Sequence, residues 1–314
     1  MKLSIITPSY NQGLYLAETI ESVISQAGEF FLDYIIVDGG SEDDSVAIIR
    51  HYEKLLAEKS WTVRCQGIEY RWQSESDRGQ TEAIMKGVGL AKGEILAWLN
   101  SDDVYLPGTL QTMAAFFREQ PETALVYGAA HYCNAGGEII GNYPTEDFDR
   151  GKLAYFNFFC QPATFFLSKA FKAVGGLDDT LHYAMDYDLF VKISKQFSCY
   201  YLPRFLAKYR LHEMSKTVGD NVLFANHEEA LLLSLKHFGW APLTRVYGAC
   251  YYYCLSRFSR TVTMFRPLVI TAALFCTLFR SLWLNRGVRK EDLQLLRVRN
   301  FQKIVKRRME ILCG

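Results

Sequence analysis

Two adjacent carboxylates follow an apolar run, in the sequence Asn100-Ser101-Asp102-Asp103. Neighbouring acids repel each other unless a positive group lies close to them. Carboxylate oxygens beside a diphosphate suit Mg²⁺ or Mn²⁺, which prefer hard oxygen ligands. The same pair could instead only stabilise the helix that begins at Pro107, because acidic residues are common near helix N-termini. Taken alone, the pair leaves both interpretations open.

Further polar segments also stand at the ends of apolar runs. Residues 7–11 and 38–41 each follow a short apolar stretch, as residues 100–103 do. If these stretches are parallel strands, their carboxyl ends meet at one edge of a sheet, where ligands bind in folds of this class. The convergence of Asp38 with the acidic pair favours a metal–diphosphate site over a helix cap.

Asp186 and Asp188 stand at the start of a predicted helix over 186–196. Either could be a helix cap. The functional interpretation is that Asp186 is a general base that removes a proton from an acceptor hydroxyl, while Asp188 supports the helix or contacts the acceptor. His212, just past a predicted strand, could be a surface histidine or a ligand of a metal or diphosphate.

The elements that must position these residues alternate between apolar strands and amphipathic helices. The expected strands are 3–7, 34–37, one near Val63, 95–99, 163–167 and 206–210. This order predicts an α/β fold with a mainly parallel central sheet covered by helices on both faces. There is no GxGxxG and no GxxxxGK[ST], so dinucleotide-binding and P-loop functions have no direct support.

The composition changes after Trp240. Residues 240–314 contain 14 Lys/Arg and 3 Asp/Glu, and they are rich in apolar and aromatic side chains. The uncharged stretch 267–279 is shorter than the roughly 20 residues of a membrane span. We therefore expect a folded α/β body over 1–239 and a helical, basic tail over 240–314 that lies on an anionic membrane surface. The alternative is an appendage that packs on the body or on a partner subunit.

Length, composition and cysteine content indicate whether the chain folds and where in the cell it is expected. The 314 residues with 49% hydrophobic content indicate a folded protein. The eight cysteines form no CxxC pair, which favours reduced thiols. The first apolar run stops at Pro8 and is too short for an export segment. We expect a cytoplasmic protein, peripheral on the inner face of the membrane, and no nucleic-acid partner, because the basic tail is too apolar.

The motifs together resemble those of family 2 glycosyltransferases, over about residues 1–215. The segments that carry the likeness are 4–11, 36–43, 77–80, 93–103, 161–165 and 185–189. The resemblance implies a GT-A fold, a nucleotide-diphosphate sugar as donor, a divalent cation (Mn²⁺ or Mg²⁺) and inversion at the anomeric carbon. The acceptor would be a hydroxyl of a glycan or lipid-linked molecule, in surface polysaccharide or glycolipid synthesis.

The resemblance also implies roles for single residues. Asp186 matches the catalytic base, Asp103 the metal ligand, and His212 a histidine near the metal and diphosphate. The residues that match nucleotide-sugar contacts are Pro8, Tyr10, Asp38, Asp77, Arg78 and Asp102.

The sequence departs from the family pattern at two places. Asn100 replaces the first Asp of the usual Asp-x-Asp-Asp, and Met185 replaces the acidic neighbour of the base. A processive polysaccharide synthase is disfavoured, because Arg71-Trp72 lacks the glutamine of a Gln-x-x-Arg-Trp motif and lies too early. The other open alternative is a non-catalytic nucleotide-sugar-binding or scaffold protein at the membrane. The sugar, the nucleotide and the acceptor are not specified by the sequence.

Overall fold

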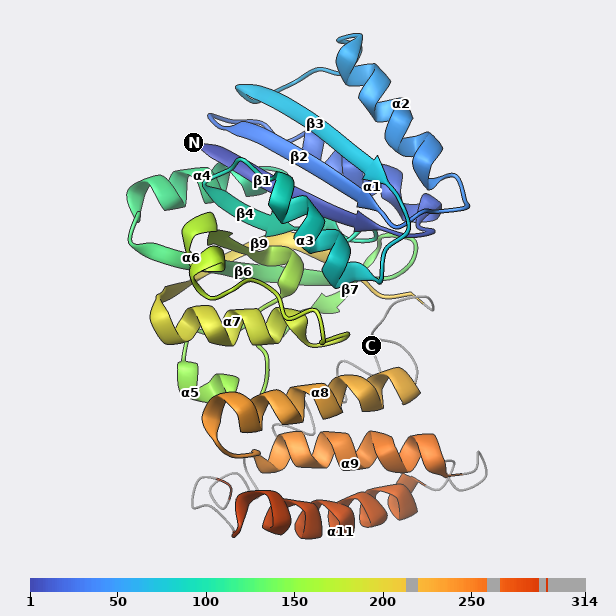
Figure 1. Cartoon of the computed structure of the whole chain (residues 1–314), viewed down its shortest axis with the longest axis vertical. Helices are drawn as coiled ribbons and strands as arrows, with labels where there is room; N and C mark the ends of the chain where they lie inside the picture. The colour runs from blue at the N-terminus through green and yellow to red at the C-terminus, as the bar shows by residue number, and fades with distance from the viewer. Residues whose placement is uncertain (213–219, 259–265, 288–291, 293–314) are drawn as a thin grey trace. The chain divides into compact units, whose positions relative to one another are not determined.

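The computed structural model describes residues 1–212, 220–258, 266–287 and 292 (Figure 1). The chain divides into two compact units, one formed by residues 1–148 and 158–210 and the other by 149–157 and 211–314. The sequence predicts a boundary between body and tail at residue 239, whereas the compact units of the structure divide after residue 210. The helix before Trp240 (220–238) packs with the helix after it (243–257), so both belong to the same compact unit. The short segment 149–157 also belongs to this unit.

The first unit contains a nine-stranded sheet and the helices around it. Its strands are β1 (Lys2–Ser9), β2 (Phe31–Asp38), β3 (Gly67–Ser74), β4 (Ile95–Trp98), β5 (Val104–Tyr105), β6 (Thr123–Cys133), β7 (Ile139–Asn142), β8 (Thr164–Leu167) and β9 (Ser198–Arg210). Its helices are α1 (Gly13–Ile24), α2 (Ser45–Ala57), α3 (Gln80–Leu90), α4 (Thr109–Glu119), the 3₁₀ turn η1 (Gln161–Ala163), α6 (Ser168–Ala173) and α7 (Met185–Gln196).

The sheet has the order β3-β2-β1-β4-β8-β6-β9-β5, and β7 pairs with β6. Strands β3, β2, β1 and β4 are parallel, whereas β8 is antiparallel to β4 and β6. The expected α/β fold is confirmed, but the sheet is mixed, because β5, β7 and β8 pair antiparallel with their neighbours. The strand expected near Val63 begins instead at Gly67, because Ile68, Tyr70 and Trp72 alternate onto the core there.

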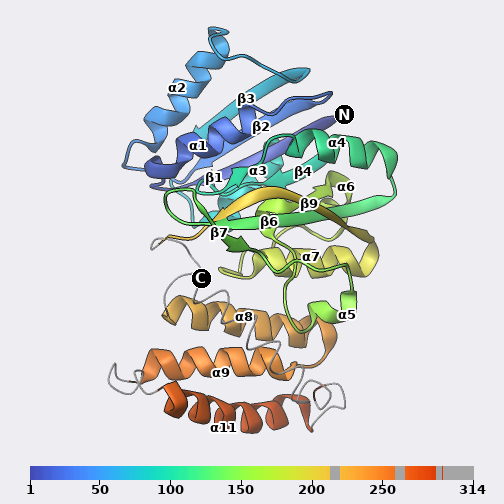
Figure 2. The same ribbon diagram turned by 180° about the vertical axis from the view of Figure 1, so that it is seen from behind.

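Alternate residues of β2 serve opposite faces of the sheet, as strand geometry requires. Tyr34 and Ile36 pack in the main core with α1, while Ile35 and Val37 pack with Ala83 of α3. In agreement, α3 lies in front of the sheet in Figure 1 and α1 lies in front of it in Figure 2. A continuous apolar strand is the pattern expected when both faces are covered.

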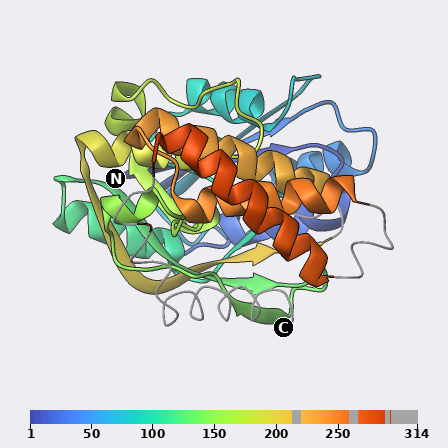
Figure 3. The same cartoon turned by 90° about the horizontal axis from the view of Figure 1, so that it is seen from below.

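The second unit contains α5 (Arg150–Leu153), α8 (Asp220–Phe238), α9 (Leu243–Arg257) and α11 (Arg266–Asn285). Helix α9 packs against both α8 and α11, as the view in Figure 3 also shows. The hydroxyl of Ser234 on α8 donates to the carbonyl of Ala154, 3.1 Å away, which joins the segment after α5 to this stack. Among the described residues one helix, α11, has the length and apolar composition of a membrane span.

Candidate active site

The parallel strands deliver their ends to a single edge of the sheet. In the strand register Ser9 lies opposite Asp38, and Asp38 lies opposite Ser74. The loops after β1, β2 and β3 therefore begin side by side. The convergence predicted from the sequence is present in the fold.

Asp38 organises two of these loops. Its buried carboxylate accepts hydrogen bonds from the Ser74 hydroxyl at 2.7 Å, the Ser41 backbone N–H at 2.9 Å and the Gly40 backbone N–H at 3.1 Å. The Ser41 hydroxyl donates to its other oxygen at 2.5 Å. Gly40 has φ of 82°, a left-handed conformation that glycine adopts readily. Asp38 thus fixes the shape of the edge.

The loop after β1 is tied to the loop after β2 through Asn11. Its backbone N–H donates to the Ser41 hydroxyl at 2.8 Å, and its side-chain oxygen accepts from the Glu42 N–H at 2.9 Å. Pro8 lies buried in β1, whereas Tyr10 is exposed at the edge. Of Pro8 and Tyr10, the two residues of this segment that the resemblance assigns to the nucleotide sugar, Tyr10 is the one with an exposed side chain.

Asp77 lies against the loop after β2, as expected for a segment that helps to enclose a ligand. Its carboxylate oxygen would be 3.0 Å from a Cβ placed on Gly39, so a side chain at that position would require Asp77 to move by a few tenths of an ångström. Asp77 also accepts from the Gly79 N–H at 2.8 Å. Arg78 is exposed, and its Nε donates to Glu82 at 2.6 Å. Asp77 thus lies at the edge of the sheet beside Gly39, while Arg78 pairs with Glu82 and Asp179.

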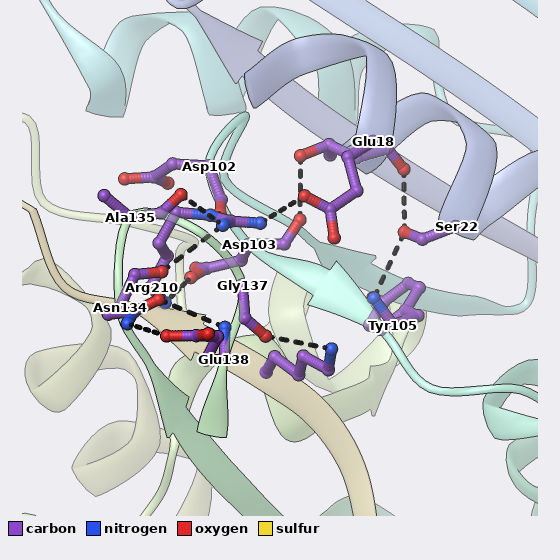
Figure 4. Close-up of polar contacts among 12 residues, drawn as sticks. Glu18, Ser22, Asp102, Asp103, Tyr105, Asn134, Ala135, Gly137, Glu138 and Arg210 are labelled. Atoms are coloured by element: carbon purple, nitrogen blue, oxygen red, sulfur yellow. Dashed lines mark hydrogen bonds and ion pairs between the residues drawn. The ribbon is translucent and has the colours of Figure 1, made fainter. Parts of the chain in front are cut away.

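The structure distinguishes the two adjacent carboxylates (Figure 4). Asp103 is fully buried, and its oxygens accept from the backbone N–H of Arg210 at 2.9 Å and from the side-chain amide of Asn100 at 3.2 Å. Burial, followed by the charge of Asp102, raises the pKa of Asp103 well above its usual value. Asp102 is partly exposed. This geometry argues against Asp103 as the metal ligand and favours Asp102.

Arg210 is the residue that the sequence reasoning missed. Its buried guanidinium donates to the carbonyls of Asp102 at 2.8 Å and Ala135 at 2.9 Å, and to the Glu18 carboxylate at 2.5 Å (Figure 4). It also lies over the Tyr15 ring, 5.0 Å from the centroid. Its partners are up to 192 residues away in the chain, so no local pattern marks it.

Asn100 connects the loop after β4 with two glutamines. Its side-chain oxygen accepts from Gln80 at 2.6 Å, and its amide donates to Asp103 and Gln161, each at 3.2 Å. Gln161 in turn donates to the carbonyl of Trp98 at 2.7 Å. An aspartate at position 100 could not make either donation, because an ionised carboxylate only accepts hydrogen bonds. Asn100, which replaces the usual aspartate of the family, is therefore required for its hydrogen bonds to Asp103 and Gln161.

Asp186 lies in the first turn of α7 and is partly exposed. After burial, the charges of Asp103 and Asp186 both raise the pKa of the Cys160 thiol, so the two carboxylates lie near the same buried sulfur. Asp188 is buried and pairs with Lys192 at 2.9 Å. Of the two predicted acids on this helix, Asp186 is the one exposed to solvent, and Asp188 stabilises the helix.

The two predicted metal ligands, Asp103 and His212, belong to different units. His212 follows β9 and belongs to the second unit, and Asp103 is enclosed. Within the described ranges, no group of three or more His, Cys, Asp or Glu side chains is arranged to hold a metal ion.

The sequence profile of the family described as "Glycosyl transferase family 2" matches residues 4–174, more than half of the chain. The chain belongs to glycosyl transferase family 2. The matched range includes the loops after β1 to β4 and η1, and it ends before α7. The match therefore covers the loops after β1 to β4, while Asp186 lies outside the matched range.

Two curated relatives of this family 2 member show the range of its similarities. It is 25% identical over 252 residues to the chondroitin synthase of Escherichia coli, matching 78% of this chain and 35% of that protein. It is 28% identical over 208 residues to the PGL/p-HBAD biosynthesis glycosyltransferase of Mycobacterium bovis, matching 66% of this chain and 72% of that protein. The chain thus spans about a third of the chondroitin synthase.

Solved structures confirm the GT-A fold of this family 2 member. The mannosyltransferase PcManGT from Pyrobaculum calidifontis, in complex with GDP-Man and Mn²⁺, superposes with a TM-score of 0.57 at 15% identity, covering 90% of this chain and 87% of that chain. S. aureus TarS 1-349 in complex with UDP gives 0.54 at 17% identity, covering 83% and 73%. At such identities the likeness concerns the fold.

Proposed function

We propose that the chain is an inverting glycosyltransferase that moves a sugar from a nucleoside-diphosphate donor to a hydroxyl of a glycan or lipid-linked acceptor. The observation that carries the proposal is the meeting of the loops after β1 to β4 at one edge, with Asp38 and Asp102 on those loops. The nucleotide sugars bound in PcManGT and in TarS 1-349 with UDP-GlcNAc support this class of donor. The named relatives support an acceptor in polysaccharide or glycolipid synthesis.

The donor half of the site would be formed by the loops that Asp38 and Asn11 hold together. Tyr10 and Asp77 border these loops, and Asp38 fixes their backbone through its contacts with Ser41 and Ser74. Preorganised loops of this kind bind a ligand without losing much conformational freedom on binding. We assign nucleoside binding to this half.

Asp102 would hold a divalent cation together with the donor diphosphate. Its carboxylate is partly exposed, while its main chain is fixed by Arg210. One carboxylate supplemented by phosphate oxygens fits Mg²⁺ or Mn²⁺, and the Mn²⁺ in PcManGT is consistent with this assignment. Such a cation would neutralise negative charge on the leaving diphosphate.

Asp186 would act as the general base. The acceptor oxygen forms a bond to the anomeric carbon, its proton passes to the Asp186 carboxylate, and the bond from the anomeric carbon to the diphosphate oxygen breaks with its electron pair leaving on the diphosphate. A single displacement of this kind inverts the anomeric centre. Asp186 lies in the first turn of α7 and is partly exposed, which leaves it accessible to an acceptor.

The proposal is tested by incubating the full chain with a panel of nucleotide sugars, with and without Mn²⁺, and measuring release of nucleoside diphosphate in the presence of lipid extract. We expect Mn²⁺-dependent release with one donor. Tight binding of nucleotide by calorimetry, with no turnover of any donor and acceptor, would instead support the non-catalytic scaffold.

A further inference from the structure

One side of α11 is a strip of large apolar side chains that faces solvent. Phe275, Phe279 and Trp283 are 65%, 63% and 79% exposed, and Leu278 and Leu282 are also exposed. Their spacing of three and four residues places all five on the same side of the helix. A contiguous apolar surface of this kind marks an interaction site.

The opposite side of α11 is already packed. Its buried residues are smaller and follow each other at intervals of four: Val269, Ala273, Thr277 and Ser281. The first two pack with Cys254 of α9. At the end of α11 the Asn285 side chain donates to the Ala241 carbonyl and accepts from the Ala241 N–H, each at 2.8 Å. These contacts hold α11 in its unit, and the apolar strip lies on the surface of that unit.

The charges near the strip are positive and stand at its ends. Arg266 begins α11 and Arg286 follows it, and residues 257–290 contain no Asp or Glu. Arg280, the charged residue in between, forms an ion pair with Glu228 of α8, so its charge is matched within the unit. An uncharged apolar strip with cations at both ends fits the boundary between acyl chains and anionic headgroups.

We propose that α11 binds the surface of an anionic phospholipid bilayer and lies in its plane, with Phe275, Phe279 and Trp283 inserted at the level of the headgroups. A crossing orientation is disfavoured by the packing of α11. Helix α9 covers its buried side and carries Arg245 and Arg257, and such charges would have to enter the hydrocarbon. The proposal does not depend on the transferase activity.

The first test is flotation of the full chain with vesicles of phosphatidylcholine, with or without phosphatidylglycerol. We expect binding to the anionic vesicles. The double variant Phe275→Ser/Phe279→Ser should reduce this binding at least about tenfold, because it removes the favourable free energy of moving two phenyl rings from water into the bilayer. Ile139→Ser/Ile140→Ser is the matched control, since these exposed residues lie on β7 of the other unit. Equal partitioning of the two double variants would overturn the proposal.

A second measurement determines the depth of α11. Lipids brominated at different positions along the acyl chain should quench Trp283 most when the bromine lies near the headgroup, and Trp283→Phe should remove that signal. Maximal quenching by the deepest bromine would mean a membrane span. A dimer of the lipid-free chain that Phe275→Ser/Phe279→Ser dissociates, together with unchanged vesicle binding, would mean that the strip binds a second copy. Either result would overturn the proposal.

Discussion

The backbone N–H of Arg210 donates a hydrogen bond of 2.9 Å to a carboxylate oxygen of Asp103, across 107 residues of sequence. The same arginine binds the carbonyl of Asp102 through its side chain. One residue of β9 thus orients the loop of the acidic pair, and it leaves Asp102 rather than Asp103 as the partly exposed carboxylate.

The two acids should respond differently to neutralisation. Asp102→Asn should abolish the activation of transfer by Mn²⁺. Asp103→Asn should keep that response and lower stability by about 1–3 kcal/mol, because its new amide would face the amide of Asn100. Activity against Mn²⁺ concentration and thermal unfolding measure the two effects. The opposite pattern, with Mn²⁺ activation lost only in Asp103→Asn, would restore Asp103 as the ligand.

Removing the proposed base should separate binding from chemistry. Asp186→Asn should bind nucleoside diphosphate as the parent does and transfer sugar about 10²–10⁴-fold more slowly, because only the proton acceptor is lost. Calorimetry and initial rates measure the two quantities. Asp188→Asn is a useful comparison, since its partner is Lys192, and it should affect stability more than rate. Transfer by Asp186→Asn at the parental rate would refute the role.

Restoring the family's usual acid at position 100 should be harmful here. Asn100→Asp loses the donations to Asp103 and Gln161 and adds a charge next to a buried carboxylate. We expect a loss of about 1–3 kcal/mol in the free energy of unfolding, partly recovered when Mn²⁺ and nucleotide are present. Denaturant unfolding with and without these ligands is the measurement. A variant as stable as the parent without ligand would contradict the network.

Arg210 should be essential for the fold of the edge. Arg210→Met removes the buried cation from Glu18 and from two carbonyls and should cost about 3–5 kcal/mol. The stability of Arg210→Lys should lie between those of the parent and Arg210→Met, because an ammonium group keeps the charge but cannot make all the hydrogen bonds of the planar guanidinium. Glu18→Gln should cost only about 1 kcal/mol or less, since Glu18 is half-exposed. Comparable losses in Arg210→Met and Glu18→Gln would show that the carbonyl contacts contribute little.

The ion pairs of Glu69 give a pH dependence to stability. Hydrogen bonds from Lys92 and then Lys2 lower the pKa of Glu69 from 4.5 to about 2. A carboxylate with a depressed pKa stabilises the fold above its unfolded pKa, and this contribution disappears as pH falls through about 2. Glu69→Gln should therefore be slightly less stable than the parent at pH 7 and equal to it below pH about 2. A constant difference at all pH values would contradict the assignment.

Much of the candidate site follows from the sequence because it depends on strand ends. Apolar runs that stop at Asp38 and before Asp102 are long enough to be buried strands, and parallel strands place their carboxyl ends at one edge. The GT-A fold and the family were expected from the resemblance of the sequence motifs to those of family 2 glycosyltransferases, which hydrophobic periodicity alone does not give. Asp186 lies in the first turn of α7, at the start of the helix that the sequence predicts over 186–196.

The tertiary structure decided what depends on distant partners. Burial of Asp103 is set by β9, and the boundary after Arg210 is set by the packing of α8 on α9. The sequence by itself determined the fold class and the edge at which polar side chains meet, because hydrophobic periodicity is local. Only the fold decided which of two neighbouring acids faces solvent, because contacts that bury a side chain come from residues far away in the chain.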